Sequence, residues 1–574
     1  MMDWTDRHCR FFHRQLSQFS LLYTEMVVAD AAIHGPRNRL LGFNDCEHPV
    51  ALQLGGSDPA KLAEAARICA DFGYDEINLN VGCPSDRVQS GTFGACLMRQ
   101  PDLVARCVAS MKAVVDVPVT VKCRIGVDEQ DTGPALDELA KAVWGEGCDA
   151  LWVHARKAWL DGLSPKENRD VPPLDYGRVH RLKTENPNQF IGLNGGIENV
   201  NHGLQSLGDV TLLDGIMLGR AAYQNPLCLA DVDHKIYGKP VRQFDPNALM
   251  EVMCDYIDRQ IQNDPGVRVN HITRHMVGLF HGVAGARRFR QILSMESVKT
   301  GATSQVVRDA FSAIEVARAG IVAGFLAGVF GIGGGAILVP VFFQAFDWAG
   351  ADDAVRMHLA VGTSLAIIVP TSLRSFSSHY KHGAVAMDVL RSYVITIPLG
   401  VLLGSMLIAS ISSSALRVVF AFIAIAVAAK LILQRDSWKL GDEIPTGLTR
   451  IVAGTGIGFL SMLMGIGGGV LNNTFMTLYG RPMHQAVATS AGAGVLISVP
   501  GLIGAAWAGW GVDGLLPFST GYVNWIAFAI VIPITIFMAP IGASFAHKIE
   551  KRQLELCFGL FLLVVAGRFF YSVI

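Results

Sequence analysis

Charged residues are distributed very unevenly along this chain of 574 residues, and that distribution constrains the fold more than any other feature. Of the 97 Lys, Arg, Asp and Glu residues, 73 lie in the first 318 positions and 24 in the last 256. Because a bilayer crossing needs about 20 apolar residues, the long uncharged stretches of the second part predict about eight membrane spans. The five longest stretches without a charge are 319–346, 392–416, 451–480, 482–512 and 514–547.

The first part has the composition of an ordinary soluble protein. Ten of the eleven cysteines lie between Cys9 and Cys254, and none forms a Cys-x-x-Cys pair. This spacing argues against a zinc site and favours free thiols in a reducing compartment. With no signal-peptide pattern at its start, this part is expected to be cytosolic. The net charge of −1 means that any surface for nucleic acid must be local.

Short apolar segments alternate with helical segments along residues 20–220. Their β-branched content favours repeated strand–helix units that build a parallel sheet. An eight-stranded βα barrel needs one more strand than the seven that can be counted, and its active site lies at the C-terminal ends of the strands. The seven are "LLYTEMVV", "HPVALQLGG", "YDEINLNVG", "VPVTVKCRIG", "DALWVHARK", "QFIGLNGGI" and "LLDGIMLGR".

Polar residues follow these strands one after another at the predicted C-terminal ends. The last two strands end in Gly-rich turns, where barrels commonly hold a phosphate on backbone N–H groups. The set therefore predicts a phosphate-bearing cofactor over the barrel mouth. Its members are Gln53, Asn80, Cys83, Lys122, His154, Asn194, Gly195, Gly196, Gly219 and Arg220.

Four long motifs in this part resemble the tRNA-dihydrouridine synthases, and most of all their A subfamily. They are "EINLNVGCPSDRVQSGTFGACLM", "VTVKCRIGVDEQD", "HARKAWLDGLSPKENRDVPPLDY" and "NGGI…GIMLGRAAYQNP", and the resemblance covers residues 1–315. It implies a TIM barrel that binds FMN, with NADPH as the reductant. The implied FMN-binding residues are Met2, Gln53, Lys122, His154, Asn194, Gly195, Gly196, Gly219 and Arg220.

The same resemblance implies the reaction. The reduced flavin gives a hydride to C6 of a uridine in the tRNA D-loop, at U20 or U20a, and Cys83 supplies the proton to C5. Hydride addition builds an enolate that needs an acid on the opposite face, so a thiol suits this position. The base must leave the stack to reach the flavin, and Asn80 is expected to receive it.

A basic groove for tRNA phosphates is expected from two segments. One is the loop after the strand "DALWVHARK", and the other is the helical segment that follows the barrel, where the family places its tRNA-contacting domain. A solvated helix face is the alternative role for these cations. The candidates are Arg156, Lys157, Lys166, Arg169, Arg274, Arg287, Arg288 and Arg290.

The second part contains an internal repeat. "GVFGIGGGAILVP" at 328–340 is echoed by "MLMGIGGGVLNNT" at 462–474, and "MHLAVGTS" at 357–364 by "MHQAVATS" at 483–490. Gly-interrupted spans at matching positions of two repeats predict a transporter site near the midplane, with free N–H groups for an anion. This part resembles the sulfite exporter TauE/SafE permeases over residues 317–574, which implies small sulfur-containing anions such as sulfite as cargo.

Nine residues are predicted to line the transport path, although ordinary helix packing is an equal alternative for the two serines. The nine are Gly333, Gly334, Gly335, Ser364, Gly467, Gly468, Gly469, Asn472 and Ser490.

The expected organisation is a fusion with no metal site. The predicted domains are an FMN-binding barrel at 1–238, a helical tRNA-binding domain at 239–316 and a permease at 317–574, with repeats at about 317–434 and 448–574. We expect a multi-pass protein of the inner (plasma) membrane with the enzyme in the cytoplasm; its oligomeric state is left open. Lys548, Lys551 and Arg552 do not fit the positive-inside rule for eight crossings: either the last hairpin is exceptional, or a glycine break makes one segment re-entrant and alters the count.

Two alternatives remain at this point: two neighbouring reading frames joined in error, and a membrane-tethered flavin dehydrogenase that feeds quinone. The first ten residues, "MMDWTDRHCR", resemble the loop after the family's first strand. From this resemblance we expect that the true start lies upstream, because a barrel without its first strand would bind flavin weakly.

Overall fold

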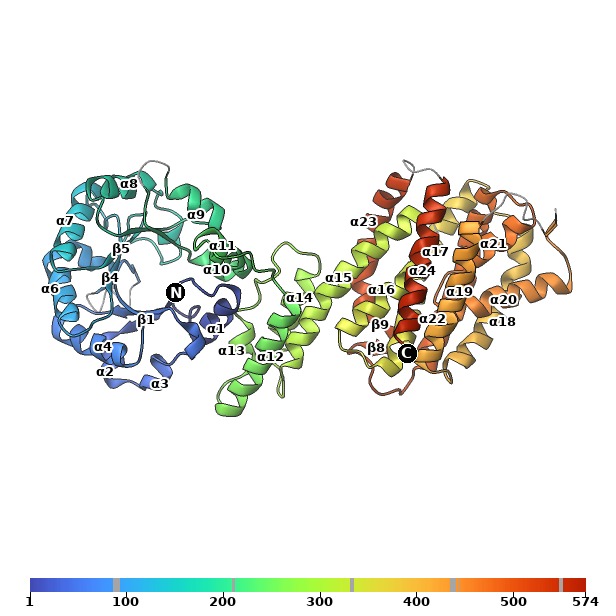
Figure 1. Cartoon of the computed structure of the whole chain (residues 1–574), viewed down its shortest axis with the longest axis horizontal. Coiled ribbons are helices and arrows are strands. Elements are labelled where there is room, and N and C mark those ends of the chain that lie inside the picture. The colour runs from blue at the N-terminus through green and yellow to red at the C-terminus, as the bar shows by residue number, and fades with distance from the viewer. Residues whose placement is uncertain are drawn as a thin grey trace. The chain divides into compact units, whose positions relative to one another are not determined.

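The computed structural model describes residues 1–85, 93–208, 212–330, 335–433, 440–441, 443–546 and 551–573. The chain divides into two compact units (Figure 1). The first comprises Met1–His281 and Leu293–Ser304, and the second Gly282–Ile292 and Gln305–Ile574. The two units are described separately.

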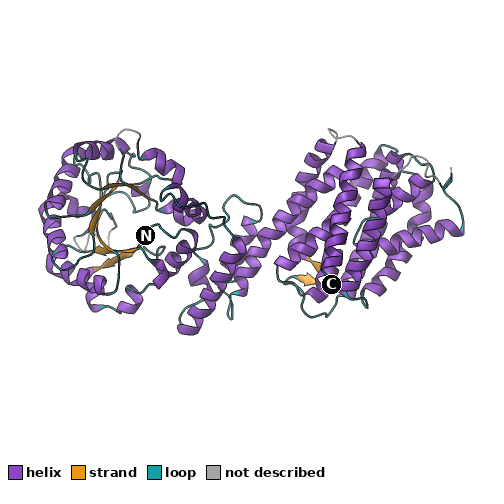
Figure 2. Cartoon of the chain, viewed as in Figure 1, coloured by secondary structure: helices purple, strands orange, loops and turns teal. Residues whose placement is uncertain are grey.

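The first unit is built on a parallel sheet whose described part has seven strands in sequence order, with helices outside it (Figure 2). Each strand pairs with the next in parallel, so all the C-terminal ends lie at one rim. This confirms the TIM-like fold class. The strands are β1 (Leu22–Val28), β2 (Val50–Gly55), β3 (Glu76–Val81), β4 (Val119–Arg124), β5 (Ala150–His154), β6 (Ile191–Asn194) and β7 (Gly215–Met217).

The central strands are buried on both faces, as expected for a sheet that is covered by helices and filled by its own side chains. Trp152 of β5 fills the barrel next to Gly192, where a Cβ atom would lie 2.2 Å from the indole ring. Capping carboxylates start α4 at Asp58 and α7 at Asp131. The main covering helices are α2 (Ala29–His34), α4 (Pro59–Asp71), α6 (Pro101–Lys112), α7 (Thr132–Gly145), α8 (Tyr176–Glu185) and α9 (Val200–Ser206).

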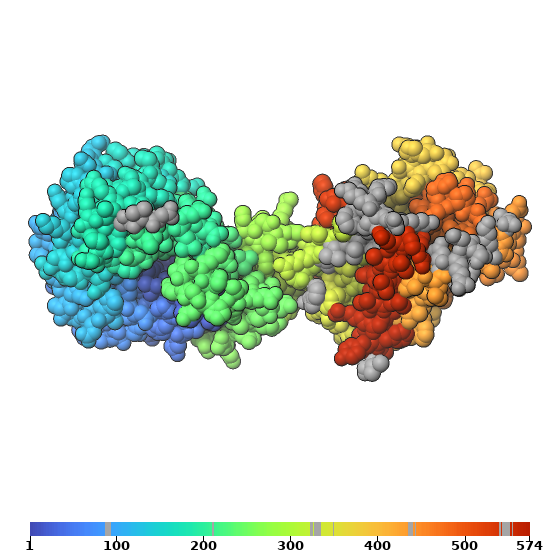
Figure 3. All heavy atoms as spheres, turned by 45° about the horizontal axis from the view of Figure 1, so that its top comes forward, coloured from blue at the N-terminus to red at the C-terminus, as the bar shows by residue number. Residues whose placement is uncertain are grey.

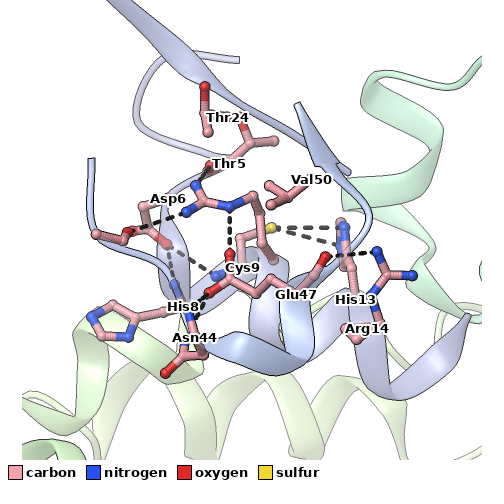
Figure 4. Close-up of polar contacts among 12 residues, drawn as sticks. Thr5, Asp6, His8, Cys9, His13, Arg14, Thr24, Asn44, Glu47 and Val50 are labelled. Carbon is pink, nitrogen blue, oxygen red and sulfur yellow. Dashed lines mark hydrogen bonds and ion pairs between the residues drawn. The ribbon is translucent and has the colours of Figure 1, made fainter. Parts of the chain in front are cut away.

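The N-terminal residues form a capped helix, α1 (Arg7–Leu16), where the sequence suggested a loop. The Asp6 carboxylate accepts hydrogen bonds from the backbone N–H groups of His8 and Cys9, which would otherwise be unpaired at a helix start. Asp6, Cys9, Arg10 and Glu47 belong to one cluster of polar contacts around this helix. Within it, Arg10 Nε lies 2.6 Å from Oε2 of Glu47, and both side chains are buried. Figure 4 shows how Asp6, Cys9 and Glu47 lie within this cluster.

Helices α12 (Pro246–Asn263) and α13 (Val269–Thr273) follow the barrel in the first unit. Next to α13, Arg274 Nη2 and His275 Nε2 both contact the Asp6 carboxylate, at 2.6 and 3.0 Å. Arg274 therefore serves as a structural partner of the α1 cap, which leaves less reason to assign it to a groove. Helix α14 (Ala286–Met295) spans the boundary between the units.

The membrane domain is helical throughout most of its described length. Four of its helices, α17, α18, α19 and α22, are long and apolar enough to cross a membrane, and several shorter apolar helices accompany them. Helix α24 runs along its surface (Figure 3). The helices are α15 (Gln305–Phe330), α16 (Gly335–Trp348), α17 (Asp353–Lys381), α18 (Met387–Ile408), α19 (Ser413–Leu433), α20 (Leu448–Met464), α21 (Gly469–Leu478), α22 (Met483–Ala508), α23 (Trp525–Ala546) and α24 (Lys551–Tyr571).

The second glycine-rich segment breaks a span into a hairpin that turns back. Helix α20 ends at Met464, Gly465 and Gly468 take left-handed conformations, and α21 then begins. The end of α21 returns to the start of α20, because Leu440 N–H donates to Leu478 O at 2.8 Å. The pair is therefore re-entrant, and one of the alternatives left open by the charge pattern holds for the second repeat.

The first repeat has a corresponding pair of helices, α15 and α16, which pack against each other. Gly285 packs against the backbone of Ala313 in α15, and the Arg288 guanidinium lies 5.6 Å from the ring of Phe518. The loop that contains Phe518 also contacts Asp352, which follows α16, through Gly514. Helix α15 therefore enters the domain, and α16 ends, on the face that contains Arg288, Asp352 and Phe518. We call it the proximal face.

Ion pairs tie the helix ends of the proximal face together. Arg417 Nη2 lies 2.6 Å from Asp353 Oδ2, and Arg417 also donates to Ser572 near the C-terminal end of α24. Arg356 pairs with Asp347 at 2.8 Å and with Asp353 at 3.2 Å. The basic residues of this face are therefore largely neutralised by nearby carboxylates.

The opposite, distal face carries a second set of cations. Arg481 there lies 3.6 Å from Asp388, and Arg552 donates to Ile432 O at the end of α19. The cations with described side chains on this face are Arg374, Lys381, Arg391, Lys430, Arg450, Arg481 and Arg552.

Candidate active site and transport path

Cys83 lies just beyond the C-terminal end of β3, at the barrel mouth, and is half-buried. Its backbone N–H donates to Asn80 Oδ1 at 2.9 Å, and the N–H of Gly82 donates to the same oxygen at 3.0 Å. Its Sγ lies 3.7 Å from Ser85 Oγ. One amide side chain thus holds the short turn that presents the thiol.

Lys122 and His154 lie on β4 and β5 at the same rim. Strand register pairs Asn80 with Lys122, and Arg124 with His154. Burial, together with the nearby Arg124 guanidinium, lowers the pKa of Lys122 to about 8. Burial is also the main reason that the pKa of His154 lies well below its usual value, so the imidazole is neutral at pH 7.

The Asn194-Gly195-Gly196 turn follows β6 beside His154. Gly195 has φ of +107°, and a Cβ atom there would lie 2.7 Å from His154 Cδ2. His154 Nε2 is buried and has no hydrogen-bond partner among the described residues. A buried nitrogen without a partner beside a glycine turn is a natural place for a ligand atom.

Of the predicted FMN-binding residues, Arg220 is paired with a carboxylate and Met2 is exposed. Arg220, at the start of α10 (Arg220–Gln224), pairs with Asp170 at 2.7 Å. Met2 is exposed, whereas Met1 lies nearer to Gly219, with its Sδ 3.8 Å from where a Cβ atom would be. Gln53 is buried and hydrogen-bonded to Asn78 and Asn80.

The loop after β5 gathers several cations at the rim. Arg156 donates to the carbonyl oxygens of Asp170 and Pro172, and Arg169 Nε has no partner among the described residues. Lys166 is fully exposed on the same loop. With Arg220, these residues form a local basic surface on a chain of nearly neutral net charge.

The arginines predicted on α14 fall in the second unit. Arg287 is exposed, and Arg288 lies against Phe518 while also donating to Gln291 Oε1 at 2.9 Å. The structure thus places Arg288 on the proximal face of the membrane domain.

The predicted transport residues of the second repeat form one buried polar cluster. Asn472 Nδ2 donates to Ser490 Oγ at 2.7 Å, and Ser490 Oγ donates to Asn473 Oδ1 at 2.6 Å. Asn472 Oδ1 and Ser461 Oγ are buried without a partner among the described residues. Ser461 Oγ lies 3.6 Å from where a Cβ atom of Gly468 would be, next to the start of α21.

The first repeat meets this cluster through small residues. A Cβ atom at Gly335 would lie 2.6 Å from Ile466 Cα, so the two glycine breaks are in direct backbone contact. Ser364 Oγ donates to Gly465 O at 2.8 Å. Gly467 and Gly469 belong to the same break in the second repeat. Gly333 and Gly334 lie outside the described residues.

Sequence reasoning missed the polar residues deeper in the barrel. Arg124 is 3% exposed and donates to the carbonyl oxygens of Gly82 and Asn168. Glu76, Asn78 and Asn80 alternate along β3, so all three side chains point to the same side of the strand. This alternation of polar residues in an otherwise apolar strand was visible in the sequence, and it indicates that polar side chains line the interior of the barrel.

Comparison with known proteins bears on both units. Residues 1–315 match the profile of the dihydrouridine synthase (Dus) family, and residues 316–569 match the sulfite exporter TauE/SafE family. The tRNA-dihydrouridine(20/20a) synthase of Shewanella oneidensis is 53% identical over 315 residues, which are 55% of this chain and 92% of that protein.

Two further relatives carry the same name. That of Vibrio cholerae is 51% identical over 322 residues, 56% of this chain and 97% of the relative. That of Escherichia coli K12 is 52% identical over 315 residues, which are 55% of this chain and 90% of the relative.

A parallel βα barrel with a cysteine at its rim, joined to a repeated helical membrane domain, defines an oxidoreductase linked to a transporter. The chain belongs to the dihydrouridine synthase family, whose members are flavoproteins, and its second part is a TauE/SafE membrane domain.

Proposed function

We propose that the first part reduces uridine to 5,6-dihydrouridine at positions 20 and 20a of tRNA, with FMN as cofactor and NADPH as reductant. The observation that carries this proposal is the Cys83 turn at the end of β3, held by Asn80 beside Lys122 and His154. The names and identities of the relatives support the substrate.

The residues at the rim fit a bound FMN. His154 Nε2 is a buried nitrogen without a described partner, Lys122 is a buried cation, and the Gly195 turn leaves room where a Cβ atom would collide. Gln53, Asn194, Gly196 and Gly219 complete the proposed contacts, with Met2 and Arg220 at their edge. When bound, FMN supplies the hydride that is delivered to C6 of the uracil ring.

Cys83 is the proposed proton donor to C5. As the C5–H bond forms, the S–H bond breaks and a thiolate is left on Sγ. A thiol can hold its proton at neutral pH and still release it to a developing enolate, because its usual pKa lies near 8.5. The Asn80 side chain fixes the turn and lines the space for the flipped base.

The loop cations are the proposed contacts to tRNA phosphates. Arg156, Lys166 and Arg169 lie on one loop at the rim, where a base entering the mouth would bring its backbone. Arg287 and Arg288 are separate proposed tRNA contacts in residues 239–316, the proposed helical tRNA-binding domain. In the same proposal, the FMN-binding barrel comprises residues 1–238.

For the second part, 317–574, we propose transport of a small sulfur-containing anion such as sulfite. The amide and hydroxyl groups of Asn472 and Ser490, and the start of α21, would contact the anion at the meeting point of the repeats. We also propose that the protein lies in the inner (plasma) membrane with its enzyme in the cytoplasm, where tRNA is found.

The enzyme is tested with the full chain in detergent, an unmodified tRNA transcript and NADPH. Replacing Cys83 by Ala should reduce dihydrouridine formation by about 10²- to 10⁴-fold, the usual worth of a general acid. Cys96→Ala is the matched control, because Cys96 is also half-buried but, in the part of the chain that the structure describes, its thiol bonds only to Phe93 O. Equal activity of wild type and Cys83→Ala would remove Cys83 as the acid.

The transporter is tested by sulfite efflux from proteoliposomes. Asn472→Leu copies the first repeat, which has Leu338 at the matching position, and should lower efflux without loss of folded protein. Intact efflux from this variant would exclude the polar cluster as the anion site. A single polypeptide detected by mass spectrometry across residues 300–330 in membranes would exclude an erroneous joining of two reading frames.

A further inference from the structure

A continuous chain of side-chain hydrogen bonds runs through the interior of the barrel. It starts at Glu76, whose Oε1 accepts from Thr120 Oγ1 at 2.6 Å and from the Tyr23 hydroxyl. Thr120 Oγ1 accepts from Asn78 Nδ2 at 2.8 Å. Asn78 Oδ1 accepts from Gln53 Nε2 at 2.9 Å.

The chain then reaches the catalytic turn. Gln53 Oε1 accepts from Asn80 Nδ2 at 2.7 Å, and Asn80 Oδ1 accepts the backbone N–H groups of Gly82 and Cys83. Every side chain between Glu76 and Cys83 is at most 9% exposed, so water cannot substitute for a missing partner. The bonds therefore depend on one another.

Both ends impose the same direction on the chain. A carboxylate can only accept, so Glu76 requires Thr120 to donate to it and Asn78 to donate to Thr120. At the other end, two backbone N–H groups require an oxygen from Asn80. The amide orientations of Asn78, Gln53 and Asn80 are thus determined twice, and the two determinations agree.

The direction decides what the mouth presents. Both N–H groups of the turn use Asn80 Oδ1, and one hydrogen of Nδ2 goes to Gln53. The remaining group of Asn80 is therefore an N–H donor. Such a donor suits a carbonyl oxygen, which uracil has at C4, and not the amino group that cytosine has there.

We propose that Glu76 and Thr120 are positioning residues that act through this chain to hold the Cys83 turn and to keep Asn80 as a donor toward a pyrimidine carbonyl. The inference rests on the proposed function, because it assigns a cause to the placement of the same thiol. Glu76 is the first residue of β3 and Thr120 the second residue of β4, so both lie away from the rim where the strands end.

The test compares Thr120→Val with Thr120→Ser in the full-length protein. Valine keeps the shape but removes the hydroxyl, whereas serine keeps it. Misplacing a reacting group by about 1 Å costs about 100-fold in rate, so we expect kcat of the valine variant to fall by about 10- to 100-fold with KM for tRNA nearly unchanged. The serine variant should retain kcat within about twofold.

A second readout does not require activity. The alkylation rate of Cys83 by iodoacetamide, followed on its tryptic peptide by mass spectrometry, reports the placement of the thiol. It should change in Thr120→Val and in Glu76→Gln but not in Thr120→Ser. Thr273→Val controls for loss of a buried hydroxyl, because Thr273 is 0% exposed and its hydroxyl donates to Leu293 O at 3.4 Å, away from the chain of bonds.

The outcomes separate the two proposals. If the wild type forms no dihydrouridine, the proposed function is wrong, and the alkylation rates still decide the inference. Equal rates of Cys83 alkylation in Thr120→Val and Thr120→Ser overturn the inference. A Thr120→Val variant that loses kcat no more than Thr273→Val does, at a matched loss of thermal stability, overturns it as well.

Discussion

Ser364 in α17 donates a hydrogen bond to the carbonyl oxygen of Gly465 at 2.8 Å, and so joins the two repeats of the membrane domain where a helix is interrupted. Gly465 O is one of the carbonyl groups left free at the end of α20. Inside a membrane such a group needs a partner from another helix, because water is absent.

Replacing Ser364 by Ala should therefore slow transport by loosening the contact between the repeats. A hydrogen bond between helices in a membrane contributes about 1 kcal/mol, so we expect efflux to fall by about fivefold with little loss of folded protein. Thr371→Ala is the control on the same helix, since its hydroxyl bonds, among the described residues, only to Ile367 O and Ile368 O. Equal efflux from both variants would argue against a role for the contact.

The buried ion pair between Arg10 and Glu47 should be a large contributor to the stability of the first unit. Both side chains are at most 5% exposed, so Glu47→Gln leaves the Arg10 guanidinium without its counterion. Removing one partner of a buried pair costs about 3–5 kcal/mol. The urea midpoint of full-length protein, followed by flavin release, measures this.

The exposed Lys61–Asp30 pair provides the comparison for that measurement. Both side chains are more than half exposed, and such pairs contribute about 0–1 kcal/mol. Lys61→Ala should therefore leave the midpoint almost unchanged. A Glu47→Gln midpoint equal to that of Lys61→Ala would contradict the prediction.

Binding of FMN should weaken at alkaline pH. The pKa of Lys122 is lowered to about 8, so in the unliganded enzyme its ammonium is charged below that pH and neutral above it. We expect the Kd for FMN, measured by fluorescence quenching, to rise between pH 7 and pH 9. Lys122→Gln should bind more weakly at pH 7 and should not lose further affinity on going to pH 9. A variant with the same pH slope as wild type would assign the effect to another group.

The orientation of the membrane domain can be tested against its charges. A cytoplasmic enzyme places the proximal face inside and leaves the basic distal face outside, which runs against the usual positive-inside bias. We expect His382→Cys, on the distal face, to react with an impermeant maleimide in intact cells, and Ser410→Cys to react only after lysis. Both are made in a Cys557→Ser background.

The reverse labelling pattern would contradict the proposed location of the enzyme. It would place the enzyme outside the cytoplasm, away from tRNA, and the proposed function would fail with it. The two candidate positions are both exposed, so differences in burial do not explain a difference in labelling.

Much of the fold could be predicted because its pattern is local. The segment "HPVALQLGG" became β2 and "YDEINLNVG" became β3, because alternation and β-branched content report directly on strands. Hydropathy located the apolar helices, but only four of the described ones are long and apolar enough to cross a membrane, against the eight or so spans expected. It could not show that α20 and α21 turn back, since the direction after Gly465 is set by packing against the first repeat.

The site was predicted in part for a related reason. Residues at strand ends, such as Lys122 and His154, could be found by position alone. The role of Glu76 depends on its bonds to Tyr23 and Thr120 from two other strands, and these contacts exist only in the folded barrel. At the N-terminus, Asp6 was a readable helix cap that resemblance to a loop obscured.

Helix α15 contains the point at which one family match ends and the other begins, between residues 315 and 316. Each residue of an α-helix turns by about 100° and rises by about 1.5 Å. A single residue inserted at this point would carry Gly320 away from Val531, its neighbour on α23, and point it toward another side of the helix. Evolution can therefore change the length of this connection only in steps that approximate whole helical turns, such as three, four or seven residues.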